Sequence, residues 1–151
     1  LPAIREAHPE TTFAIVGRNP TPAGVELSAL PGVQVTGAVD DVRTWLAGAD
    51  VVVAPLRIAR GIQNKVLEAM AMAKPVVAST AAAEGIDAVD GEHLFVARDA
   101  SDEATKVAAL LSDTDERLRL GAAARAHVMA QYGWDAQLAL LDSLMEAGAA
   151  K

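Results

Sequence analysis

The chain of 151 residues is long enough for one domain and leaves little room for a second hydrophobic core. Hydrophobic residues make up 52% of it and charged residues 22%, which excludes an intrinsically disordered segment. A formal net charge of -7 argues against binding to nucleic acid or anionic lipid, and the absence of cysteine excludes disulfides and thiolate metal sites.

Short β-branched runs alternate with Ala- and Leu-rich runs over the first hundred positions. Nearly continuous apolar content predicts strands that are buried on both faces, and the longer runs between them predict helices. In chain order the predicted elements are strand 12–16, helix 23–30, strand 33–36, helix 41–47, strand 50–54, helix 64–73, strand 76–79 and strand 93–97. This spacing favours parallel strands joined by right-handed crossovers.

Three consecutive helices are predicted after the last strand, at 101–111, 115–130 and 135–147. Ser101 and Thr114 are the expected N-caps of the first two. The predicted fold class is therefore α/β: an open parallel sheet with Rossmann-like winding, followed by a C-terminal helical tail.

Residues 1–8 have the pattern of the last turns of a helix that leads through Pro9 into the first strand. A helix that packs on a parallel sheet normally follows a strand, and none precedes this one. We therefore expect the sequence to begin inside a larger protein.

The segment 50–79 carries most of the chemistry. Its first strand ends at Pro55 and opens into a polar loop, 57–63, which leads into a helix. Ligands of open α/β sheets bind outside the carboxyl ends of the strands, where loops meet helix N-termini. Gly61 allows the backbone to come close to a ligand, and the first amides of the helix are suited to an anion.

Charged side chains in the same loop indicate a phosphate ligand. Arg57, Arg60 and Lys65 place three cations within nine residues of an acidic chain. Asn64 and Glu68 are four residues apart and share one helix face, so the Glu68 carboxylate is placed to accept hydrogen bonds from ribose hydroxyls.

Each feature also has a plainer interpretation. A glycine near a helix start is often only a turn, and a Lys65–Glu68 pair is often a solvated contact. Gly17 and Arg18 follow a strand and are equally well explained as a ligand contact or as a turn. The G-x-G-x-x-G pattern is absent there, which argues against a nicotinamide or flavin cofactor. For residues 84–86, a structural loop is preferred over a role in lining the cleft.

The stretch 61–79, GIQNKVLEAMAMAKPVVAS, resembles the signature of the group 1, retaining, nucleotide-sugar-dependent glycosyltransferases of the GT-B fold. In that family two Glu residues eight apart and a Gly-rich turn precede an Ala-Met-Ala helix, and a Lys/Arg-Pro-Val-Val strand entry follows. The parts of this chain that resemble the family are 13–17, 33–41, 67–71, 74–79, 91–96 and 132–134. The Arg-Gly-Ile-Gln-Asn-Lys loop resembles subgroups that assemble exopolysaccharide.

The resemblance implies a donor site at this loop. Glu68 corresponds to the second Glu, which hydrogen-bonds the ribose, and Val39 lies where the family lines its base pocket. The segment where backbone amides meet the diphosphate and the transferred sugar comprises Gly61, Ile62, Gln63 and Asn64.

Two departures affect the sugar site. Position 60, where the family has its first Glu, holds Arg60, and the second glycine of the turn is Gln63. The guanidinium could bind phosphate or an acidic sugar, or it could pair with a carboxylate of the absent half. No catalytic residue is therefore assigned.

The function that the resemblance implies belongs to a larger enzyme. Residues 1–151 would be the C-terminal donor-binding domain of a hexosyltransferase, truncated at its N-terminus and inactive alone, that transfers a sugar to a glycan or lipid-linked acceptor. The expected partners are the nucleotide sugar, which is the substrate and needs no cofactor, and the absent N-terminal acceptor-binding domain. No nucleic acid and no metal site are expected.

Without a basic leader or an apolar run of about 20 residues, we expect a cytoplasmic location, with any peripheral membrane association made through the absent half. Two alternatives stay open: a non-catalytic nucleotide-sugar-binding or scaffold module, and a nucleotide-sugar epimerase of the same fold.

Overall fold

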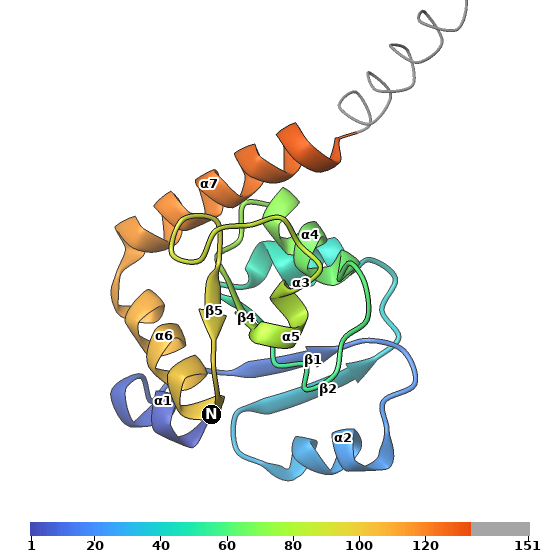
Figure 1. The fold of residues 1–151 in the computed structure, drawn as a ribbon. Helices are drawn as coiled ribbons and strands as arrows, with labels where there is room; N and C mark the ends of the chain where they lie inside the picture. The colour runs from blue at the N-terminus through green and yellow to red at the C-terminus, as the bar shows by residue number, and fades with distance from the viewer. Residues whose placement is uncertain (134–151) are drawn as a thin grey trace, which may run out of the picture.

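Residues 1–133, which are the part of the chain that the computed structural model describes, form an α/β domain with parallel strands (Figure 1). In chain order the elements are α1 (Pro2–Ala7), β1 (Phe13–Val16), α2 (Pro22–Glu26), the 3₁₀ turn η1 (Leu27–Ala29), β2 (Val33–Gly37), α3 (Val42–Gly48), β3 (Val52–Ala54), α4 (Asn64–Ala71), β4 (Val76–Ser79), α5 (Thr80–Ala83), β5 (Phe95–Ala97), α6 (Ala100–Ser112) and α7 (Thr114–Tyr132).

All five predicted strands are present, and the α/β class with parallel strands is confirmed. The predicted helix 23–30 is split into α2 and η1, and the short helix α5 was not predicted. The predicted helix 135–147 lies outside the described residues.

Both predicted N-caps in the helical tail are wrong by one or two residues. Asp99 caps α6, because its carboxylate accepts hydrogen bonds from the amides of Ser101 and Asp102. Asp113 caps α7 through the amide of Glu116. A carboxylate at the N-cap combines a hydrogen bond with a favourable interaction with the helix dipole.

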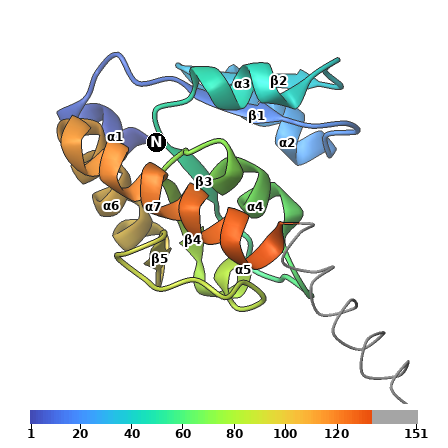
Figure 2. The same ribbon diagram turned by 90° about the horizontal axis from the view of Figure 1, so that it is seen from above.

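The strands fall into two parallel sheets rather than the single predicted one. β1 pairs with β2, and β4 lies between β3 and β5. Among residues 1–133, β1 and β3 are each paired along one edge only. Figure 2 shows β1 and β2, with α2 and α3, as a layer set apart from the second sheet and its helices.

The buried core is built around β4. The side chains of Val76 and Ala78 lie in one apolar cluster, with α4 and α7, whereas Val77 lies in a second cluster with α6. Successive residues of a strand face opposite sides of the sheet, so β4 is covered on both faces. Figure 1 shows α7 running across the top of this unit.

The prediction that all strands are buried on both faces holds only for β4. No residue before Val66 is among the buried hydrophobic residues of the described chain, and the apolar side chains of β1, β2 and β3 are half-buried, except for Ala14, which is exposed. The physical reason is that the buried residues of α4, α6 and α7 cluster on the two faces of β4, whereas no residue of β1 or β2 belongs to either cluster. Within residues 1–133, no helix is long and apolar enough to cross a membrane.

One carboxylate connects β5 to α6 and makes stability depend on pH. Asp102 accepts hydrogen bonds from the amide of Arg98 and the ammonium of Lys106, and these partners hold its pKa well below the usual range. A lowered pKa stabilises the fold above the ordinary carboxyl pKa of about 3.9, and this stabilisation is lost as the pH falls below that value.

We therefore expect Asp102→Asn to reduce stability at neutral pH, with a difference from the wild type that shrinks as the pH falls from about 5 towards 3. Urea unfolding followed by circular dichroism at several pH values measures this. Asp115→Asn, an exposed change in the first turn of α7, serves as the control. A difference that stays constant down to pH 3 would contradict the assigned role.

Candidate functional site

The connection from β3 to α4 lies at the carboxyl end of the second sheet. The Ser79 hydroxyl, at the end of β4, donates a hydrogen bond to the carbonyl of Leu56 at 2.6 Å. The same hydroxyl accepts from the amide of Ala82 at 3.2 Å and so caps α5. One side chain therefore holds the start of the loop against the end of the neighbouring strand.

The loop then reaches α4 in a conformation that requires glycine. Gly61 has a φ of 67°, in the left-handed region, and its carbonyl accepts a hydrogen bond from the side chain of Gln63 at 3.1 Å. Gln63 is the N-cap of α4, yet no side chain caps this helix, whereas α2, α3, α5, α6 and α7 are each capped by a side chain. The amides of Asn64 and Lys65 are thus open to an external acceptor, whereas the amide of Val66 donates to the carbonyl of Gln63 at 2.9 Å.

Unpaired cations gather around this loop. Arg18, Arg57, Arg60 and Lys65 are exposed, and within residues 1–133 none of their side chains forms a hydrogen bond or an ion pair. Every other Arg and Lys in that part of the chain has a hydrogen-bond partner: Arg5, Arg43, Lys74, Arg98, Lys106, Arg117, Arg119 and Arg125. Basic side chains left unpaired in an acidic chain, and all near one strand-end region, are suited to an anionic ligand.

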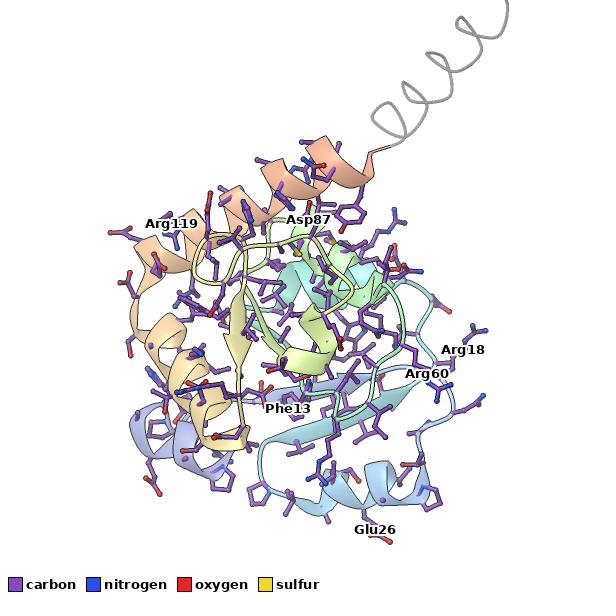
Figure 3. The ribbon with its side chains drawn as sticks, in the orientation of Figure 1. Phe13, Arg18, Glu26, Arg60, Asp87 and Arg119 are labelled. Atoms are coloured by element: carbon purple, nitrogen blue, oxygen red, sulfur yellow. The ribbon has the colours of Figure 1, made fainter. Side chains whose placement is uncertain are left out.

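The strands of the first sheet, β1 and β2, also end near the β3–α4 loop. The Lys65 ammonium lies 4.0 Å from the point where a Cβ on Gly17 would be, and the Gly17 amide donates to the carbonyl of Gly37 at 3.2 Å. The ends of β1 and β2 therefore lie beside the start of α4. Figure 3 shows Arg18 and Arg60 on the same side of the molecule, both pointing outward.

A cavity of about 380 Å³ opens next to the loop. Its walls come from the β3–α4 loop and from α5 with the turn that follows it, and its lining consists of Ala59, Arg60, Gly61, Ala81, Glu84 and Gly85. Glu84 and Gly85, in the segment 84–86 for which a structural loop was the preferred interpretation, both line this cavity. The sequence contains a signal for α5, which forms one wall of the cavity, because Ser79 followed by Thr80 and three alanines is a capped helix start.

The two walls touch through backbone atoms. A Cβ on Gly85 would lie 2.6 Å from the carbonyl oxygen of Gly61 and 3.1 Å from the amide nitrogen of Ile62. Only glycine at position 85 allows this approach.

The other predicted site residues lie outside the cavity lining. Arg57, Ile62, Asn64, Lys65 and Glu68 are exposed along the loop and the first turns of α4. The Glu68 side chain forms no hydrogen bond within residues 1–133. It therefore remains free to bind a ligand over the helix surface.

Val39 is half-buried just after β2 and does not line the cavity. In the described part of the chain, no three His, Asp or Glu side chains form a group that could hold a metal ion.

Comparison with known proteins gives the class of this chain. The family model described as glycosyl transferases group 1 matches residues 1–113, and the chain belongs to this family. The resemblance found in the stretch 61–79 is thereby confirmed. The comparison with curated protein sequences gave no match.

Solved structures share the fold. Anabaena Alr3699/HepE in complex with UDP has a TM-score of 0.78 at 19% identity, over 95% of this chain and 44% of that one. Sucrose-phosphate synthase (tll1590) from Thermosynechococcus elongatus has a TM-score of 0.75 at 23% identity, over 97% of this chain and 41% of that one.

The C-terminal domain of LpcC, a glycosyl transferase group 1 family protein from Francisella tularensis, has a TM-score of 0.72 at 23% identity over 87% of this chain and 76% of that one. The present chain thus spans less than half the length of HepE and of the synthase, and most of the isolated LpcC domain.

Proposed function

We propose that this chain is the donor-binding domain of a glycosyltransferase that transfers a hexosyl unit from a nucleotide diphosphate sugar to a glycan or lipid-linked acceptor. The observation that carries the proposal is the set of unpaired cations, Arg18, Arg57, Arg60 and Lys65, around the uncapped start of α4. The family membership supports the same reaction class.

Stabilisation of the departing diphosphate is the chemistry that this loop offers. Negative charge grows on the leaving diphosphate as the sugar is transferred, and preoriented amides and cations lower the barrier most when they face that charge. In this proposal, the amides at the start of α4 and the side chains of Arg57 and Lys65 supply this stabilisation. Retention at the anomeric carbon is part of the proposal and requires no base from this chain.

Glu68 is proposed to bind the ribose. It lies one helical turn beyond Asn64, so its carboxylate shares the helix face that begins at the phosphate site. A carboxylate accepts two hydrogen bonds from vicinal hydroxyls without distortion.

The domain arrangement is a further part of the proposal. The chain would form the C-terminal half of a two-domain, cytoplasmic GT-B enzyme in exopolysaccharide assembly, with an acceptor-binding domain before it. The edges of β1 and β3 that have no partner within residues 1–133 support this. A doubly wound sheet has the strand order 3-2-1-4-5-6, so its first strand lies between the second and the fourth. In the proposed arrangement β1 and β3 are this second and fourth strand, and their edges that are unpaired in the described part of the chain flank the place of the first. A longer form that includes the preceding domain should transfer sugar, whereas residues 1–151 alone should bind donor and transfer nothing.

The test is calorimetric titration of the full-length enzyme with UDP and GDP, compared with Glu68→Ala. UDP is the first choice because the HepE structures contain UDP and UDP-glucose. Loss of hydrogen bonds to a charged group, worth about 1.5–3 kcal/mol, predicts affinity weaker by roughly 10- to 100-fold.

The control for this test is Glu26→Ala, an exposed carboxylate on α2 that Figure 3 shows at the lower edge of the molecule, whereas Arg18 and Arg60 lie at its right edge. No heat with either nucleotide at millimolar concentration would favour the scaffold module instead. A free sugar nucleotide with inverted stereochemistry as the only product would favour the epimerase.

A further inference from the structure

The cavity beside the loop has walls of opposite charge. Arg60 comes from the β3–α4 loop and Glu84 from the end of α5, and both side chains are exposed. No ion pair joins them, and neither side chain has another polar partner within residues 1–133. The two charges thus line one cavity while each keeps its hydrogen-bonding capacity.

Such a pair selects for a neutral polyhydroxyl group. A guanidinium only donates hydrogen bonds and a carboxylate only accepts them, whereas a hydroxyl does both. An anionic group would be attracted by Arg60 but repelled by Glu84, and a cationic group the reverse, so neither gains from both walls. A sugar with vicinal hydroxyls can use both walls at once.

The size of the cavity agrees with a small occupant. Its volume of about 380 Å³ is near the lower end of the range of roughly 300–1,000 Å³ for small-molecule sites. It also adjoins Gly61, the glycine of the loop that leads to the proposed diphosphate site.

We propose that Glu84 binds the hydroxyls of the transferred sugar and that the donor therefore carries a neutral hexose. This inference rests on the proposed function. The carboxylate that the resemblance places at position 60 is replaced there by Arg60, and a carboxylate is supplied instead from the opposite wall. Arg60 donates hydrogen bonds to the sugar from its own side.

The backbone position of Glu84 is fixed by its surroundings. It is the C-cap of α5, and its amide donates to the carbonyl of Thr80 at 3.0 Å. The adjacent Gly85 lies directly against the backbone of Gly61. The walls are therefore held together by main-chain packing, and a substitution of the Glu84 side chain leaves that packing in place.

The experiment measures UDP and UDP-glucose binding to the full-length enzyme by calorimetry, for the wild type, Glu84→Gln and Glu84→Ala. We expect UDP affinity to stay within about twofold and UDP-glucose affinity to fall by about tenfold in Glu84→Ala, with a smaller fall in Glu84→Gln. The control is Asp87→Asn, an exposed carboxylate three residues later that does not line the cavity. It should change neither affinity. If GDP binds in place of UDP, the same comparison uses GDP and GDP-mannose.

Three results would decide against the inference. Equal losses of UDP and UDP-glucose affinity in the Glu84 variants would mean that Glu84 acts on the nucleotide or on the fold. Unchanged UDP-glucose affinity in the Glu84 variants would remove Glu84 from the sugar site while leaving nucleotide binding intact. Tighter binding of UDP-glucuronate than of UDP-glucose by the wild type would assign an acidic sugar instead. Absence of nucleotide binding in the wild type is a different failure, since it overturns the proposed function itself.

Discussion

Gly121→Ala is expected to lower the free energy of unfolding by about 1–3 kcal/mol, although alanine is the better helix former by about 1 kcal/mol at an exposed site. Gly121 is a buried residue of α7 at its crossing with α4. A Cβ at this position would overlap the carbonyl oxygen of Ala73, just beyond the end of α4. The steric cost therefore exceeds the gain in helix propensity.

The carbonyl of Ala73 has little freedom to move. Ala73 has a φ of 55°, and the amides of Ala73 and Lys74 donate to the carbonyls of Met70 at 2.9 Å and Ala69 at 3.0 Å. These two bonds form a Schellman C-cap, which fixes the end of the helix. Relief of the overlap would have to move α7 away from α4, and Leu120 and Ala124, which are fully buried, would lose their packing.

Urea unfolding of the full-length protein measures the effect of Gly121→Ala. The matched control is Gly48→Ala, the same substitution at the last residue of α3, where a Cβ would have no atom within 4 Å. This control should be neutral or slightly stabilising. Equal stability of Gly121→Ala and the wild type would show that α7 does not cross α4 at this residue.

Gly85→Ala is expected to weaken donor binding by roughly 10- to 100-fold, because a misplacement of about 1 Å in a binding site can cost that much. The added Cβ would lie 2.6 Å from the carbonyl oxygen and 2.8 Å from the carbonyl carbon of Gly61. These are backbone atoms, so the overlap cannot be relieved by a side-chain rotation. The loop must move, and with it the amides and cations proposed to hold the diphosphate.

Calorimetry with UDP and with UDP-glucose measures this loss, and both affinities should fall in Gly85→Ala. That pattern differs from Glu84→Ala, for which only the nucleotide-sugar affinity should fall. Thermal unfolding of the same variant shows whether the domain is still folded, and Gly48→Ala again provides the control for the substitution itself. Wild-type affinities in a folded Gly85→Ala protein would contradict a site built on this loop.

Much of the fold followed from local sequence patterns. Short β-branched runs and longer Ala-rich runs predicted every strand, because the period and length of apolar runs report local conformation directly. The stretch 61–79 carried the most discriminating part of the family resemblance, since it combines a glycine turn, an Ala-Met-Ala helix and a Lys-Pro-Val-Val strand entry in a fixed order. Parallel pairing followed from the alternation of these elements.

The site was predictable in outline for the same reason. The loop 57–63 directly follows a strand, and parallel strands place their carboxyl ends along one edge, so its location in the fold was inferable from the chain order. Arg57, Arg60 and Lys65 could be named because they are close in the sequence.

What only the tertiary structure decided involves residues far apart in the chain. Arg60 and Glu84 are brought to one cavity by the pairing of β3 with β4, and nothing in either local pattern reports that distance. Local patterns also did not report the division of the strands into two sheets. Nor did they report which basic side chains find partners and which four stay unpaired among residues 1–133. Backbone propensity depends on neighbours within a few residues, whereas the partner of a charge depends on how the elements pack.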